Sequence, residues 1–283
     1  MFGLTLMQRR ASIPARINII GEHTDYAGGK AMPFAVDVRM VLQATALDEG
    51  YEGGATVVAL WKSAGGWPAR LEIESDIPIG VGMSSSAALC LAVVLCVNGK
   101  MKPFEACLEA QRIEHEVLKT PCGLLDQMAM MFAKEGHASV IDFSNNTVDS
   151  YAVPSEWMFK LVDSGIHRTL SDASYRSSKD ESIVSAHVAS ENQRVELAVG
   201  ATAQELGELL NQSHASLIRR GVSLPEMDAQ VAALQQTDGV YGARMMGGGF
   251  GGMILVLVAS EEILPNQRLY RPSQGGFVEE FFE

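Results

Sequence analysis

The most constraining feature of the sequence is an apolar run at residues 87–97 that follows a loop rich in glycine and serine. The run is apolar on nearly all sides and too short to cross a bilayer, so we expect a buried helix over residues 84–97, capped by serine. The chain has 283 residues, of which 47% are apolar and 20% charged. It is long enough to build a core around this helix, as one large domain or two smaller lobes, and is not an extended disordered chain.

The formal net charge is -12, from 34 acidic and 22 basic residues. An acidic chain without a basic stripe is a poor nucleic-acid binder, so no nucleic-acid partner is expected. Four cysteines form neither a dense disulfide framework nor a zinc-ligand spacing. The first residues lack the order of a signal peptide, so we expect a cytoplasmic protein without a membrane partner, either a monomer or a homodimer.

Strand and helix signals interleave along the chain, which indicates a mixed α and β class. A turn signal at Asn145-Asn146 marks the start of the second half, so we expect two domains, residues 1–150 and 151–283. Strands are expected at residues 16–20, 56–60, 71–73, 138–143, 159–164, 242–246 and 253–259. Further helices are expected at residues 104–118, 124–132, 180–199, 203–216 and 225–234.

The loop before the apolar helix reads IPIGVGMSSSAA over residues 77–88. Gly80 and Gly82 allow backbone N–H groups to approach an anion, and the helix N-terminus adds unpaired donors. The hydroxyls of Ser84, Ser85 and Ser86 can donate to phosphate or bind Mg²⁺. No Gly-Lys-Ser/Thr follows, so this is not a Walker loop. A plain helix cap after a tight turn is the alternative, but three successive serines favour phosphate binding.

Two further loops carry polar or glycine-rich patterns. Residues 247–252, GGGFGG, match Gly-x-Gly-x-x-Gly, but a strand is expected after them, so a dinucleotide site is not predicted. A flexible turn is the alternative there. Residues 21–26, GEHTDY, place two carboxylates, an imidazole, a hydroxyl and a phenol directly after a strand. Such groups suit a polyol such as a sugar, and a polar surface loop is the alternative.

Taken together, these segments resemble a known family. Residues 14–26, PARINIIGEHTDY, resemble the galactokinase signature, and residues 122–127, CGLLDQ, resemble the galactokinase catalytic segment. Residues 211–217, NQSHASL, are also similar to galactokinases. Residues 77–88 and 244–252 resemble the second and third motifs of the wider GHMP family of galactokinase, homoserine kinase, mevalonate kinase and phosphomevalonate kinase. The motifs occur in order over nearly the whole chain.

The resemblance implies an α+β fold with a mixed N-terminal lobe, a ferredoxin-like C-terminal lobe and an active site between them. It implies an unusually short member that uses ATP and Mg²⁺ to phosphorylate the anomeric hydroxyl of galactose. A kinase for another pyranose or a heptose is one alternative, and a sugar- and ATP-binding sensor without turnover is another. The three intact serines favour the enzyme, because such sensors carry a damaged second motif.

The resemblance also implies roles for single residues. Asp126 would accept the proton of the attacking hydroxyl, while Arg16 would keep that carboxylate charged and stabilise the transferring phosphoryl group. Ser86 and Glu114 would hold Mg²⁺. The ATP phosphates would be wrapped by Gly80, Gly82, Ser84, Ser85 and Ser86. The sugar would be held by Glu22, His23, Asp25, Gly123 and Tyr175.

Ordinary structural roles compete with these assignments. Asp126 could cap a helix, Glu114 could be a solvated charge, and Glu22 or Asp25 could brace Arg16 or a turn. The segment from Asp37 to Pro78 also lacks the family's helix that helps to hold adenine. Two residues are candidates to replace it, with packing in the core as the alternative. They are Trp61 and Trp67.

Overall fold

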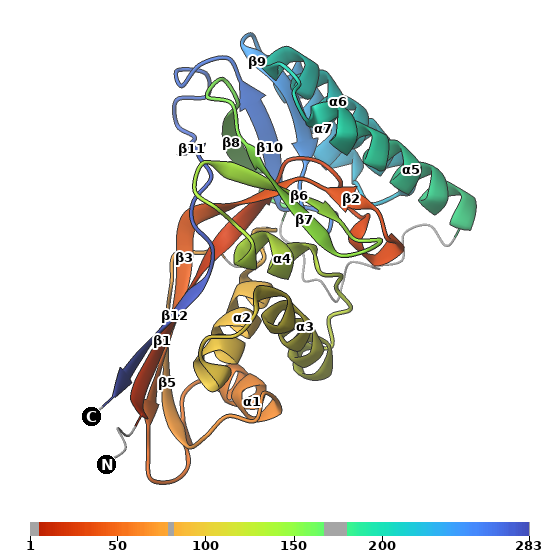
Figure 1. Ribbon diagram of the computed structural model, residues 1–283. Coiled ribbons are helices and arrows are strands. Elements are labelled where there is room, and N and C mark those ends of the chain that lie inside the picture. Colours follow the sequence, from red (N-terminus) through yellow and green to blue (C-terminus); the bar gives the residue numbers. More distant parts are fainter. Residues whose placement is uncertain (1–5, 79–81, 167–179, 283) are drawn as a thin grey trace.

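The computed structural model describes residues 6–78, 82–166 and 180–282. Its first sheet has the strand order β12-β1-β3-β5-β4. The long central strands β1 (Leu6–Asn18) and β3 (Pro33–Ala46) run antiparallel to each other. The other members are β5 (Ala69–Ser75), β4 (Tyr51–Glu52) and β12 (Phe277–Phe282). Figure 1 shows helices packed against one side of this sheet.

The apolar run forms α2 (Ser85–Asn98), which packs on β1 and β3. Because its side chains are apolar all round, it is buried between this sheet and the helices α1 (Ala55–Ser63) and α3 (Pro103–Ile113). A short π-helical segment, η2 (Glu114–Leu118), continues α3, and α4 (Leu125–Met131) follows. A small antiparallel sheet of β2 (Lys30–Ala31), β6 (His137–Asp142) and β7 (Thr147–Ala152) completes the first lobe.

The second lobe is a sheet of order β11-β8-β10-β9 covered by helices. Its strands are β8 (Met158–Asp163), β9 (Val240–Met245), β10 (Met253–Val258) and β11 (Leu269–Tyr270). Its helices are α5 (Glu181–Ala198), α6 (Ala203–Arg220) and α7 (Pro225–Gln235). Asp180 caps α5, and a capping box of Thr202 and Glu205 begins α6.

The alternation of side chains along β10 joins the two lobes. Ile254, Val256 and Val258 pack in a core with residues of α6 and α7, whereas Leu255 and Leu257 belong to the main core that includes β1, β3 and α2. Successive strand residues point to opposite faces, so one strand serves both cores. The two lobes therefore share a continuous apolar contact rather than a hinge alone.

Most expected elements are present, with one strand predicted wrongly. Residues 56–60 form part of helix α1, not a strand. The β-branched run Thr56-Val57-Val58 favours a strand locally, but Val57, Leu60 and Trp61 recur at helical spacing and are buried. Strand β1 also ends at Asn18 rather than residue 20, and the sequence patterns had not indicated β3 or β7.

The chain returns to the first lobe at its last strand. β12 pairs antiparallel with β1, with Val278 opposite Ala11. The division into residues 1–150 and 151–283 remains a prediction, and β12 contributes to the sheet of the first part. Among the described residues, no single helix has the length and apolar character to span a membrane, and one pair, Ser85–Asn98 with Pro103–Leu118, meets both only together and is bent by 116°.

Trp61 belongs to the core rather than to a nucleotide site. Its side chain is fully buried, its ring meets that of Trp67 edge-on, and its Nε1 donates to the carbonyl oxygen of Trp67 at 2.7 Å. We expect Trp61→Phe to lower the free energy of unfolding by about 1–3 kcal/mol, through the lost hydrogen bond and the space left behind. The KM for ATP should be unchanged. A raised ATP KM at wild-type stability would instead place Trp61 against the nucleotide.

Candidate active site

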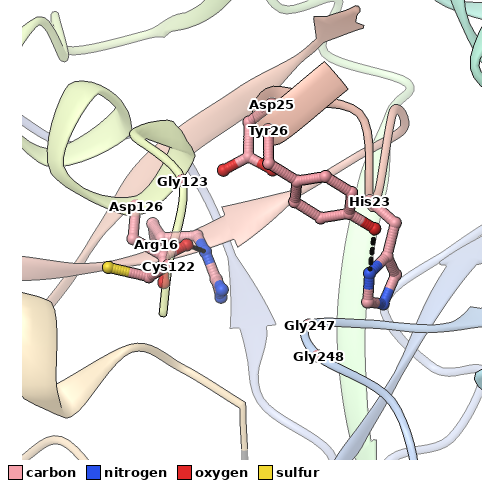
Figure 2. A pocket seen from close by; sticks show the side chains of 9 residues that line it. All are labelled: Arg16, His23, Asp25, Tyr26, Cys122, Gly123, Asp126, Gly247 and Gly248. Carbon is pink, nitrogen blue, oxygen red and sulfur yellow. Dashed lines mark hydrogen bonds and ion pairs between the residues drawn. The ribbon is translucent and has the colours of Figure 1, made fainter. Parts of the chain in front are cut away.

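A small open cavity lies where loops of both lobes meet (Figure 2). One wall comes from β1 and the loop that begins α4, and the other from the loop after β1 and the glycine-rich loop between β9 and β10. It is lined by Arg16, His23, Asp25, Tyr26, Cys122, Gly123, Asp126, Gly247 and Gly248. Residues from four separate predicted motifs are thus brought into contact with one space.

The Arg16–Asp126 ion pair forms one end of the cavity. Arg16 Nε donates to Asp126 Oδ1 at 2.7 Å, and Arg16 Nη1 donates to the carbonyl oxygen of Gly82 at 2.6 Å. Ser84 Oγ donates to Asp126 Oδ2 at 2.5 Å from a left-handed backbone with φ of 63°. The Asp126 side chain is 30% exposed and faces the cavity, whereas that of Arg16 is 4% exposed. The carboxylate is therefore fixed at both oxygens and still open to a ligand.

Asp25 lies between this end and the far end of the cavity. It accepts a hydrogen bond from the backbone N–H of Leu125 at 3.2 Å, and a Cβ at Gly123 would collide with its carboxylate. Gly123 thus allows the loop before α4 to close on Asp25. Burial, together with the negative charges of Asp126 and Glu22, raises the pKa of Asp25 to about 6.

His23 and Tyr26 form the far end of the cavity, away from Asp126 (Figure 2). His23 Nδ1 and the Tyr26 hydroxyl are hydrogen-bonded at 3.0 Å. Burial lowers the pKa of His23 to about 4, so its ring is neutral at pH 7. Sequence reasoning did not assign Tyr26 to the site, although its place at the end of GEHTDY was the available signal.

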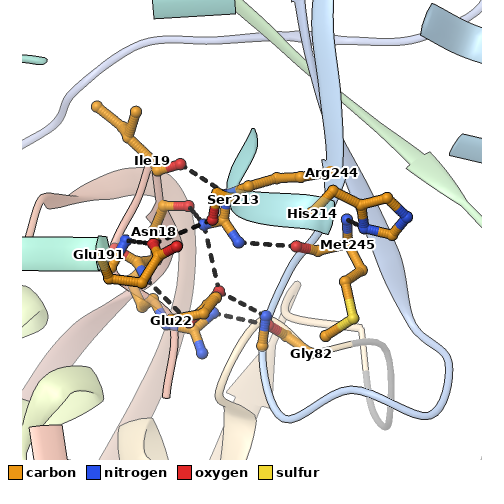
Figure 3. A network of polar contacts seen from close by, with 12 residues as sticks. Asn18, Ile19, Glu22, Gly82, Glu191, Ser213, His214, Arg244 and Met245 are labelled. Carbon is orange, nitrogen blue, oxygen red and sulfur yellow. Dashed lines mark hydrogen bonds and ion pairs between the residues drawn. The ribbon is translucent and has the colours of Figure 1, made fainter. Parts of the chain in front are cut away.

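Glu22 does not line the cavity. Its carboxylate accepts hydrogen bonds from Gly247 N at 2.7 Å and Asn18 Nδ2 at 2.9 Å, and lies 3.4 Å from Arg244 Nη2 (Figure 3). Burial opposes its ionisation, but the charges of Arg244 and Arg16 and these hydrogen bonds outweigh it, so the pKa of Glu22 is lowered. Glu22 joins the loop after β1 to the glycine-rich loop of the second lobe.

Arg244 completes this joint from the second lobe. The residue is fully buried, and its guanidinium donates to the carbonyl oxygens of Ile19 at 2.8 Å and Asn18 at 2.5 Å. A third hydrogen bond goes to the carbonyl oxygen of Met245 at 2.7 Å. Five planar donors suit several acceptors at once, so one side chain holds the end of β1 against β9.

Ser86 and Glu114 meet beside the first turn of α2. Ser86 Oγ donates to Glu114 Oε1 at 2.8 Å, and Gln127 Nε2 donates to Oε2 at 2.9 Å. Glu114 is only 2% exposed, which excludes a solvated charge, and burial raises its pKa. The π-helical turn of η2 contains Glu114, and such turns often occur at functional sites.

These oxygen donors fit a Mg²⁺ ion. Mg²⁺ prefers oxygen ligands and is usually bound by one or two protein groups, with water and substrate phosphates completing its shell. Within the described part of the chain, no group of three or more His, Cys, Asp or Glu side chains could hold a metal by itself. A metal at Ser86 and Glu114 would therefore depend on the phosphates of a nucleotide.

The remaining predicted phosphate-loop residues lie next to the ion pair or outside the described residues. Gly82 has a φ of 81°, and its carbonyl oxygen binds Arg16. Ser85 is the first residue of α2, where backbone N–H groups lack intrahelical partners. Gly80 and Tyr175, predicted to bind phosphate and sugar, fall among residues 79–81 and 167–179 and lie outside the described residues.

Comparison with known proteins agrees with the resemblance. Residues 7–46 match the galactokinase galactose-binding signature, residues 53–134 the N-terminal domain of GHMP kinases, and residues 196–268 their C-terminal domain. The galactokinase of Chloroflexus aurantiacus is 30% identical over 331 aligned positions, covering 90% of this chain and 85% of that protein. The galactokinase of Thermotoga maritima is 31% identical, covering 88% of this chain and 89% of that protein.

Solved structures show the same fold. A Lactococcus lactis galactokinase complexed with galactose has a TM-score of 0.79 at 23% identity, over 95% of this chain and 94% of that chain. The Methanococcus jannaschii mevalonate kinase has a TM-score of 0.72 at 17% identity, over 95% of this chain and 99% of that chain.

Fold and site together define a kinase of the GHMP class, built from two lobes with the phosphate-loop motif at the start of a buried helix. Within that class, the chain belongs to the galactokinase family. It is a short member: the alignment to the Chloroflexus aurantiacus protein spans 331 positions, more than the 283 residues of this chain.

The raised pKa of Asp25 predicts a pH-dependent gain in stability on its removal. A carboxyl whose folded-state pKa is raised contributes stability below its ordinary pKa, and this is lost as the pH rises through the folded value of about 6. We therefore expect Asp25→Asn to gain about 2 kcal/mol in unfolding free energy, relative to wild type, between pH 4 and pH 7.5.

Denaturant unfolding at several pH values measures this difference. Asp149→Asn is the matched control, because Asp149 is exposed on β7. A difference between Asp25→Asn and wild type that stays constant across the pH range would contradict the shifted pKa.

Proposed function

We propose that this protein is a galactokinase that transfers the γ-phosphoryl group of ATP to the anomeric hydroxyl of galactose, giving galactose 1-phosphate. The observation that carries the proposal is the Arg16–Asp126 pair, which opens onto a small polar cavity beside the N-terminus of α2. Relatives of about 30% identity over about 90% of the chain are galactokinases. The solved neighbour from Lactococcus lactis is complexed with galactose.

Asp126 orients the attacking hydroxyl. Arg16 binds one carboxylate oxygen and Ser84 the other, so the carboxylate cannot rotate, and its remaining lone pairs face the cavity. The anomeric hydroxyl donates to Asp126 and passes its proton there as the bond to phosphorus forms. Arg16 places positive charge beside the reacting oxygens. Phosphoryl transfer depends chiefly on such positioning and on charge stabilisation.

The N-terminus of α2 receives the phosphates of ATP. Its unpaired backbone N–H groups and the adjacent serines supply donors and a partial positive charge. Ser86 and Glu114 are the residues that would hold Mg²⁺. The ion neutralises charge on the phosphates when it is bound.

The far end of the cavity holds the rest of the sugar ring. With the anomeric hydroxyl at Asp126, the opposite edge of a pyranose lies toward His23 and Tyr26, and Asp25 lies between the two ends (Figure 2). Asp25 and neutral His23 are hydrogen-bonding partners for ring hydroxyls, and Gly123 gives the ring room. Glu22 acts on the sugar through its loop, because its carboxylate is bound to Gly247 and Asn18. Tyr175 remains in the proposed sugar-binding set.

The two alternatives receive less support than galactose phosphorylation. A sensor without turnover needs no ordered Arg16–Asp126 pair, and the relatives are galactokinases rather than kinases of other sugars. We further propose a cytoplasmic enzyme without nucleic-acid or membrane partners, active as a monomer or a homodimer. The net charge of -12 supports the first of these exclusions.

The sugar preference tests the substrate. Galactose and glucose differ in the direction of one hydroxyl, and a site that binds this hydroxyl rejects the epimer because buried polar groups are left unpaired. ADP release should show kcat/KM at least about 100-fold higher for galactose than for glucose. Asp25→Ala should narrow this ratio with the ATP KM little changed. Equal use of both sugars by the wild type would reject galactose as the specific substrate.

Asp126→Asn tests the reacting group. The amide keeps the shape of the side chain but cannot take the proton, so kcat should fall by about 10²–10⁴-fold. Galactose affinity, measured by calorimetry, should change by less than about threefold, because the hydrogen bonds of Asp25 and His23 remain. Asp149→Asn, at an exposed carboxylate, should behave as wild type. Wild-type turnover in Asp126→Asn would remove Asp126 from the chemistry.

A further inference from the structure

Glu191 is a fully buried carboxylate that the proposed chemistry does not use. It lies on α5 of the second lobe, and its Oε2 accepts hydrogen bonds from Gly21 N and from Ser213 Oγ, both at 3.0 Å (Figure 3). Its Oε1 accepts two from Arg194, at 2.9 Å from Nε and 2.5 Å from Nη2. The two carboxylate oxygens therefore accept four hydrogen bonds from three partners.

Gly21 is the first residue of the loop GEHTDY that supplies the far half of the cavity. Its φ is +89°, and a Cβ there would collide with the carbonyl oxygen of Lys30, which follows the loop. The peptide at Gly21 is thus packed tightly against the other arm of the loop. Its N–H points to Glu191, so the position of the loop entry depends on that carboxylate.

The same helix holds the loop at two further points. His187 Nε2 lies 2.9 Å from the carbonyl oxygen of Glu22, and Asn192 Oδ1 accepts from Lys30 N at 2.7 Å. The carbonyl can only accept, so His187 Nε2 carries the proton and Nδ1 accepts from Ser216 Oγ at 2.9 Å. Residues 187, 191 and 192 share one helix face. That face therefore holds the entry, the second residue and the exit of the loop.

We propose that Glu191 is a positioning residue for the sugar. It acts through Gly21 on the loop that carries Asp25 and His23, and this inference rests on the proposed galactokinase function. Its neighbours require a carboxylate. A glutamine would have a single acceptor oxygen, and its NH₂ group would face either the Gly21 N–H or the guanidinium of Arg194. One buried donor would then lose its acceptor and be displaced.

Glu191→Gln should therefore separate the two substrates. We expect the KM for galactose to rise about tenfold, which corresponds to one buried donor left unpaired, with the ATP KM and kcat within about twofold of wild type. Glu196→Gln is the matched control, since it makes the same change on α5, at an exposed residue whose ion pair with Lys30 reaches the same loop exit. It should leave both KM values unchanged. A galactose KM within twofold of wild type in Glu191→Gln, or equal rises in both KM values, would overturn the proposal.

Asn192→Ala covers the case in which Glu191→Gln does not fold. Asn192 is only partly buried, and its removal leaves Lys30 N without its acceptor. A selective rise of about threefold or more in galactose KM is expected. An unchanged galactose KM would overturn the role of this helix face. Wild type is assayed alongside: no turnover of galactose by wild type would reject the proposed function, whereas active wild type with unaltered variants would reject only the present inference.

Discussion

The ion pair between Arg16 and Asp126 is the interaction around which the rest of the site is arranged. Arg16 belongs to the central strand β1 and Asp126 to the first turn of α4, 110 residues later in the chain. A charged pair held at 2.7 Å with one partner almost buried requires rigid supports on both sides. The sheet and α2 supply one support, and the Gly82 carbonyl and Ser84 hydroxyl bind the two charges.

The two lobes divide the work. The first lobe carries the reacting pair, the serines and the loop that contacts the sugar. The second lobe fixes where that loop lies, through Arg244 and Glu191 and through the glycine-rich loop that binds Glu22. The chemistry therefore depends on residues that never touch the cavity, and the shared apolar core makes this support rigid.

The elements with strong local signals were predictable from sequence. The helix α2 follows from a run that is apolar on all sides, and the active-site loops from ordered motifs. The helix α1 was mistaken for a strand because β-branched residues outweigh helical spacing over a short window. Glu114 reads as a solvated charge until the fold buries it against Ser86 and Gln127. Glu191 has no signal, because its role arises only when α5 reaches Gly21.

The central claim is that the anomeric oxygen of galactose attacks phosphorus at Asp126. Incubation of the protein with ATP and galactose labelled with ¹⁸O at the anomeric position, followed by ³¹P NMR of the sugar phosphate, tests it most directly. The account predicts a single sugar 1-phosphate whose phosphorus signal carries the ¹⁸O isotope shift, because the C–O bond of the sugar is retained. A phosphate on another hydroxyl, a product without the isotope shift, or no transfer would contradict it.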